Sequence, residues 1–185
     1  MEKLTIKNCK FINNSGIYLA PQKTDDEIYG YDKNSEQYAS EPTQTLFGYH
    51  KLWIKDVLIT DCLFDFDENI GKSSAHNIRI NVNSVENITI QRNTFNGSWT
   101  SALQVLGGTS GNGYATKGGF ASASGNIRIG NNKINNCRER AFKIYRIENA
   151  IIELAYNTIK NTDVDSTDSE VIKISEIRDY NSSIY

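Results

Sequence analysis

The chain has few of the residues that most metal and nucleophilic sites need. Its 185 residues include three cysteines and two histidines. The cysteines are Cys9, Cys62 and Cys137; no two of them are closely spaced, so no zinc site is indicated. His50 and His76 are far apart in the sequence, and no nucleophile motif lies near either one. We therefore interpret the cysteines as small buried hydrophobic residues and the histidines as surface residues.

Charge and long apolar runs are limited as well. The formal net charge is −2, which predicts no general attraction to nucleic acid or to a membrane surface. No apolar stretch is long enough to cross a bilayer. Residues 1–3 lead directly into the first repeat, so we expect no signal peptide in this chain. Because nothing before Leu4 could cap a stack of repeats, we expect a segment of a longer protein, or ends covered by other subunits.

What the sequence does contain is an eight-residue unit that recurs along it. In each copy two apolar residues alternate with polar ones, an Asn or Cys follows, and an apolar residue closes the unit. The copies are residues 4–11, 57–64, 88–95, 127–134 and 152–159. Alternation with a period of two residues indicates β-strands, and recurrence along the whole chain indicates a repeat fold.

A further strand is predicted after each unit. These strands are residues 17–19, 77–82, 102–106, 141–145 and 171–174. Strand, Asn turn, short strand, loop and strand together make one coil of a parallel β-solenoid, in which stacked coils share one core. We expect two inward rows: Leu4, Val57, Ile88, Ile127 and Ile152, then Ile6, Ile59, Ile90, Ile129 and Leu154. Asn93, Asn132 and Asn157 should stack at a turn and bond to one another, with Cys9 and Cys62 at the same repeat position.

Two long insertions interrupt the repeat in what we interpret as a single domain, residues 1–185. Residues 21–50 are acidic and then aromatic, and residues 107–125 are rich in Gly and Ser. The second insertion lacks the Gly-Lys-Ser/Thr ending of a phosphate-binding loop. Both insertions follow the last strand of a coil, so they should leave the solenoid at the same corner, roughly 10 Å apart. Two loops so placed could wall a groove.

The repeat resembles that of the right-handed parallel β-helix proteins, the pectate-lyase-like superfamily of polysaccharide lyases, glycoside hydrolases and phage tailspikes. The resemblance extends over residues 4–174 and implies an all-β, right-handed parallel β-helix of about five to seven coils, with insertions at one corner. It also implies an extracellular or virion-associated protein. The chain has no Gly-His-Gly or Arg-Ile-Lys triplet of polygalacturonases and no Trp-Ile-Asp-His run of pectate lyases. The resemblance therefore implies a fold without assigning a reaction.

The strand alternation predicts one polar row on the outer face of the last strands. Its members are Tyr18, Arg79, Gln104, Lys143 and Lys173. Arg and Lys could bind the carboxylates of an anionic polysaccharide, and Tyr could stack on sugar rings. For a lyase, the predicted catalytic residues are Lys143, Arg79 and Tyr145, and a second cation or Ca²⁺ would stabilise the enolate. The predicted substrate-binding residues are Gln104, Lys173, Tyr18 and Tyr114. The alternative is that these are ordinary polar side chains on the outside of a sheet.

Carboxylates offer a second chemistry, since a glycoside hydrolase needs two of them beside the bond it cleaves. The candidates are Asp61, Asp65, Asp67 and Glu68 after one unit, and Asp163, Asp165 and Asp168 after another. Asp is also common in turns for structural reasons. The stretch 163–168 is a candidate Ca²⁺ site, although it lacks the Gly and distal Glu of an EF-hand loop. The leading hypothesis is a carbohydrate-active module of lyase or hydrolase type, and the alternative is a non-catalytic adhesin, appendage or scaffold segment.

Overall fold

Each coil of the chain is made of three short strands. The computed structural model describes residues 2–13, 16–19, 54–67, 77–81, 85–98, 100–106, 121–122, 126–148, 151–162, 170–178 and 183–184. The first three coils contain β1 (Lys3–Lys7), β2 (Lys10–Ile12) and β3 (Ile17–Leu19), then β4 (Ile54–Thr60), β5 (Leu63–Asp65) and β6 (Ile78–Asn81), then β7 (Val85–Gln91), β8 (Thr94–Ser98) and β9 (Ser101–Leu106). The next two contain β11 (Asn126–Gly130), β12 (Lys133–Cys137) and β13 (Arg140–Glu148), then β14 (Ile151–Ala155), β15 (Thr158–Lys160) and β16 (Ile172–Arg178).

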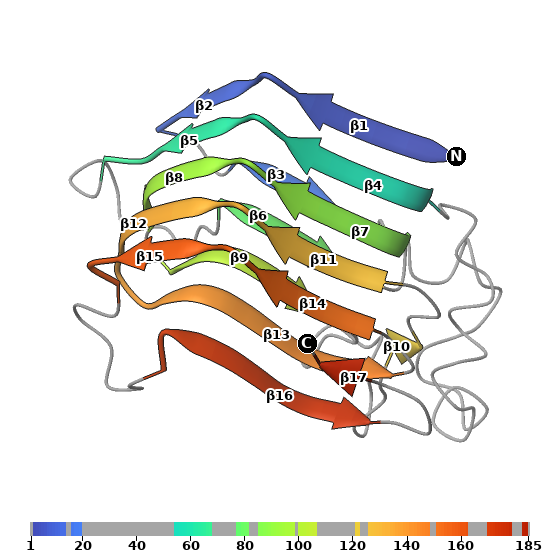
Figure 1. Ribbon diagram of the computed structural model, residues 1–185. Coiled ribbons are helices and arrows are strands. Elements are labelled where there is room, and N and C mark those ends of the chain that lie inside the picture. The colour runs from blue at the N-terminus through green and yellow to red at the C-terminus, as the bar shows by residue number, and fades with distance from the viewer. Residues whose placement is uncertain are drawn as a thin grey trace, which may run out of the picture.

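Equivalent strands of successive coils pair in parallel and form three sheets (Figure 1). Sheet A runs β1-β4-β7-β11-β14 and ends with β17 (Ser183–Ile184). Sheet B runs β2-β5-β8-β12-β15, and sheet C runs β3-β6-β9-β13-β16. The short β10 (Ala121–Ser122) pairs with the end of β13, beyond the stretch that β9 occupies. The predicted right-handed parallel β-helix is confirmed, with about five coils. No helix occurs among the described residues, so none of them forms one that could span a membrane.

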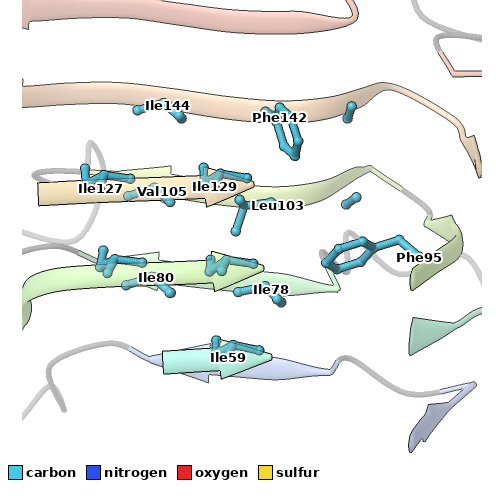
Figure 2. Close-up of a cluster of buried hydrophobic side chains, with 14 of the residues drawn as sticks. Ile59, Ile78, Ile80, Phe95, Leu103, Val105, Ile127, Ile129, Phe142 and Ile144 are labelled. Atoms are coloured by element: carbon cyan, nitrogen blue, oxygen red, sulfur yellow. The ribbon is translucent and has the colours of Figure 1, made fainter. Parts of the chain in front are cut away.

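The core is built from the two inward rows that the sequence predicts. The pairing register aligns Val57 with Ile88 and Ile127, and Ile59 with Ile90 and Ile129. All six side chains are buried. Sheet C contributes further buried residues to the same core; among those shown in Figure 2 are Ile78, Leu103 and Phe142, which align on successive strands. Burying one such side chain stabilises the fold by about 1.5–3 kcal/mol, so the stacked rows are the main source of stability.

Sheet B adds a row of aromatic rings to this core. Phe11 and Phe64 stack with ring centroids 4.7 Å apart, and Phe64 and Phe95 stack at 4.8 Å. These distances match the spacing between neighbouring strands of a sheet. In the next two coils Ile134 and Ile159 occupy the same row. The row thus fills the interior beside sheet B with large apolar groups.

An asparagine ladder links the coils at the turn between sheets A and B. The side-chain nitrogen (Nδ2) of Asn132 donates to the carbonyl of Ile90 and to the Asn157 side-chain oxygen, both at 3.0 Å. Its own oxygen accepts from the backbone and side-chain nitrogens of Asn93, at 3.0 and 3.1 Å. Asn93 repeats the pattern one coil earlier, where its oxygen accepts from the backbone N–H of Cys62. The predicted stacking and mutual bonding of these asparagines are confirmed.

The residue before each ladder position has a left-handed backbone. These residues are Asn8, Asp61, Arg92, Asn131 and Tyr156, with φ between 54° and 57°. Asn and Asp tolerate this conformation well, whereas Arg and Tyr do so less readily. The second turn, between sheets B and C, has a left-handed residue in four coils: Asn13, Gly97, Asn136 and Asn161. A Cβ on Gly97 would lie 2.5 Å from the Phe66 carbonyl oxygen, so in the third coil only glycine fits at this position.

We expect Asn132→Ala to destabilise the fold by about 2–4 kcal/mol, because it orphans the buried N–H of Asn93 and the carbonyl of Ile90. Urea unfolding would measure this as a lower midpoint with an unchanged slope. The neighbouring Lys133→Ala serves as the control. Lys133 is exposed, so its loss should change stability by about 0.5 kcal/mol or less. An Asn132→Ala protein as stable as the control would contradict the ladder's role.

Candidate functional site

The outer face of sheet C carries the row that the sequence predicts. Parallel pairing aligns Tyr18 with Arg79, Arg79 with Gln104, Gln104 with Lys143, and Lys143 with Lys173. We refer to these five residues as the sheet C row. The predicted alignment is confirmed, and the roles given to its members stay predictions.

Aromatic rings accompany two of the cations. The Arg79 guanidinium carbon lies 5.2 Å from the centre of the Tyr18 ring, and Tyr18 itself is 59% exposed. The Lys143 ammonium lies 5.2 Å from the centre of the Tyr145 ring, which comes from the same strand. Both distances are within the range of cation–π attraction. Each pair therefore places a positive charge beside an aromatic ring on sheet C.

Gln104 is an exception in the row. The sequence predicts an exposed side chain, but Gln104 is only 4% exposed, so that expectation is wrong. Its side-chain oxygen is buried and has no hydrogen-bond partner among the residues that the structure describes. We attribute its burial to its place in the middle of the sheet, where the long side chains of Arg79 and Lys143 flank it on the adjacent strands. Gln104 is therefore less accessible to a ligand than its neighbours.

Lys173 differs from the other cations because a carboxylate lies beside it. Its ammonium is 3.4 Å from a Glu170 oxygen. The other Glu170 oxygen lies 3.4 Å from Arg140, which is 3% exposed and also pairs with Glu139 at 3.3 Å. Glu170 thus partly neutralises the end of the row. Arg79 and Lys143 are the two other cations of the sheet C row.

Several predicted residues lie outside the described part of the chain. They are Tyr114, Glu68, Asp163, Asp165, Asp168, all of 21–50, and 107–125 except Ala121–Ser122. The strands preceding the two insertions are described: β3 and β9 lie on either side of β6, with Leu19 and Val105 both aligned with Ile80. The strands before the two insertions therefore end at the same edge of sheet C.

None of the described carboxylates of the hydrolase hypothesis belongs to a strand of sheet C. Asp61 is in the turn between sheets A and B, where Arg92 binds both of its oxygens at 2.8 and 3.0 Å. This guanidinium, together with the Thr60 hydroxyl, lowers the pKa of Asp61 to about 2. A general acid needs a raised pKa, so Asp61 is unsuited to that role. Asp65 and Asp67 are exposed residues that follow the start of β5.

The described residues contain no group of three or more His, Cys, Asp or Glu side chains that could hold a metal ion.

The cysteines are free thiols. Cys9 and Cys62 occupy equivalent positions on adjacent coils, next to residues that pair in register. Burial raises the pKa of Cys62. Burial also raises the pKa of Cys137 to about 11. Cys62 and Cys137 therefore stay protonated at neutral pH and are poor nucleophiles.

A polar hollow lies on the outer face of sheet A. It has a volume of about 230 Å³ and lies over β7, β11 and β14. Sequence reasoning missed it, because residues distant in the chain form it together. One signal was present: Tyr156 stands where three of the four other repeats have Asn or Asp. The sequence also contains an Asn-Thr-Asp triplet at residues 161–163, which is unrelated to the hollow. This triplet is part of the polygalacturonase pattern. Asn161 and Thr162 follow β15 of sheet B, and Asp163 is outside the described residues.

Comparison of the chain with protein-family models, with curated proteins and with solved structures finds no match. The function must therefore be inferred from the geometry of the two outer faces.

The ion pair between Asp61 and Arg92 leads to a prediction about pH. We expect Arg92→Gln to raise the pKa of Asp61 from about 2 toward its usual 3.8. Because the folded-state pKa is lowered, the pair adds stability above about pH 4, and this stability is lost as the pH falls toward 2. Carboxyl NMR titration would measure the pKa, and unfolding between pH 2 and 5 would show a shallower dependence in the variant. Arg128→Gln, a change at another exposed arginine, should leave the Asp61 titration as it is; equal curves for wild type and Arg92→Gln would refute the assignment.

Proposed function

We propose that this chain is a carbohydrate-binding parallel β-helix module, related to the pectate-lyase-like superfamily, that holds an anionic polysaccharide along the sheet C row. The observation that carries the proposal is the alignment of Arg79 and Lys143 on one face, each within 5.2 Å of a tyrosine ring. We further propose that the protein acts outside the cell or on a virion, where such polymers are accessible.

The chemistry of the row suits a negatively charged, linear polymer. Guanidinium and ammonium groups form charge-assisted hydrogen bonds with carboxylates or sulfates. The exposed ring of Tyr18 offers an apolar face beside these charges. The row crosses five adjacent strands, so it is roughly 19 Å long and runs perpendicular to them. An extended polysaccharide could therefore contact several members of the row at once.

The proximity of Lys143 and Tyr145 favours a second candidate, a polysaccharide lyase. In this reaction Lys143, Arg79 or Tyr145 would take the proton from the carbon next to a uronate carboxylate. The remaining electron pair would form a double bond as the glycosidic oxygen leaves and takes a proton from water. A neighbouring cation would stabilise the enolate formed on the way. A hydrolase has less support, because Glu170, the carboxylate described beside the row, is engaged by two cations.

We expect Lys143→Ala and Arg79→Ala to weaken the binding of an anionic polysaccharide by about 1.5–3 kcal/mol each, because each change removes a charge-assisted contact. This corresponds to about a tenfold or larger increase in Kd. Calorimetric titration with polygalacturonate, alginate and heparin as probes would measure it, and binding should also weaken as salt is added. Both variants should unfold within about 1 kcal/mol of wild type, because their side chains lie outside the core.

Lys133→Ala is the matched control, since Lys133 is an exposed lysine on sheet B. It should bind each probe as the wild type does. Equal loss in all three variants would point to general charge attraction, and no loss in any would rule out the row as the site. Ultraviolet absorbance of unsaturated uronides separates the two candidates: product formation selects the lyase, and binding without product selects the non-catalytic module.

A further inference from the structure

The hollow on the outer face of sheet A has the features of a built site. Gly130 and Ala155 form its floor, and the walls include Gln91, Arg128, Glu153 and Tyr156. Gln91, Gly130 and Ala155 are aligned on successive strands and face outward, since the residue before each one, Ile90, Ile129 or Leu154, packs in or against the core. The two small residues therefore lower the surface between taller polar neighbours.

Gly130 has little room for a larger residue. A Cβ at this position would lie 3.2 Å from the carbonyl oxygen of Ala155, closer than an ordinary van der Waals contact. Most of the other coils place a longer side chain at the equivalent position, as with Thr60 and Gln91. The hollow thus depends on the small residues of the fourth and fifth coils, with β7 of the third coil beside them.

The charged groups at the hollow balance each other. The Arg128 Nε atom lies 3.3 Å from a Glu153 oxygen, and both side chains are largely exposed to solvent. Arg128 provides further N–H donors, Glu153 provides a second acceptor oxygen, and Gln91 provides one of each. The walls therefore offer both donors and acceptors without net charge. Such a surface suits hydroxyl groups, which both donate and accept, better than an anion.

Tyr156 provides the strongest indication of a ligand. Its ring is 86% exposed, and its backbone is left-handed, with φ 57°. Asn8, Asp61 and Asn131 occupy the equivalent turn position and tolerate this conformation. A bulky residue such as Tyr is unfavourable in the left-handed region; Arg92, the other such residue at this turn position, is held there by its ion pair with Asp61. An exposed aromatic in a strained conformation at the rim of a polar hollow is typical of a binding site.

We propose that this hollow binds one unit of a neutral sugar, stacked on the ring of Tyr156 and hydrogen-bonded by Gln91, Arg128 and Glu153. The site is separate from the sheet C row, because it lies on another face of the helix and binds an uncharged ligand. It does not depend on the function proposed for that row. With both sites, one molecule could hold a charged and a neutral glycan segment on two faces.

The test compares two substitutions of the same residue. Probes are the neutral hexasaccharides cellohexaose, xylohexaose and mannohexaose, added to the labelled wild-type protein at millimolar concentration. At least one should shift the NMR amide signals of Gly130, Asn131 and Tyr156, and its affinity should not change with salt. Tyr156→Phe keeps the ring and should bind as wild type does. Tyr156→Asn removes the ring and should weaken binding about tenfold or more.

The melting temperature provides a second readout. If Tyr156 served only to stabilise the fold, Tyr156→Asn would lower the melting temperature. Asn tolerates the left-handed conformation better than Tyr, so Tyr156→Asn should raise the melting temperature while it lowers affinity. Thr5→Ala, an exposed outward position on β1 of the same sheet, is the control and should change neither property. The proposal is overturned if none of the three probes shifts these amide signals, or if Tyr156→Asn binds as tightly as the wild type. Lys143→Ala should leave neutral-sugar binding intact, which separates this site from the sheet C row.

Discussion

The in-register pairing of parallel strands determines every other feature of this protein. Successive side chains on a strand point to opposite faces, so a shift of one residue between coils would exchange the core with the surface. The asparagine ladder opposes such a shift. The Asn132 amide bonds to the coils on both sides, and its four hydrogen bonds require each coil to present the same residue at the same turn. A buried amide without these partners would be costly, so the ladder favours the correct register over its alternatives.

The same register creates a difficulty on the outer face, because it places like charges on adjacent strands about 4.8 Å apart. Sheet C contains three features that reduce the repulsion. Gln104, a neutral residue, separates Arg79 from Lys143. Glu170 forms an ion pair with Lys173, the cation that lies beside Lys143 in the row. The rings of two tyrosines attract the remaining charges. This arrangement lowers the electrostatic cost of placing three cations in one row.

Local pattern was enough to predict the strands, the inward rows and the Asn stack, because each depends on alternation and position within one repeat. Features that depend on neighbours across coils were not predictable in the same way. The burial of Gln104 and the pairing of Lys173 with Glu170 follow from side chains on adjacent strands. The hollow beside Tyr156 requires small residues on two coils and long ones around them. Sequence order does not reveal such combinations until the insertions are removed and the coils are aligned.

The ladder also implies that stability is unevenly distributed along the helix. From Asn157 back to Asn93 each rung is tied by amide hydrogen bonds, but the next two rungs carry Cys62 and Cys9. The Cys62 thiol reaches the Ile6 carbonyl of the adjacent coil only at 3.8 Å, and thiols are weak donors. Leu4 and Ile6 of that coil are half-buried, whereas their counterparts in the second to fourth coils are buried. With weaker rung-to-rung bonds and less apolar burial, the first coil should open at a lower free energy than the central coils. The Asn-linked third and fourth coils, whose inward residues in sheet A are buried, should therefore be the more stable part of the scaffold.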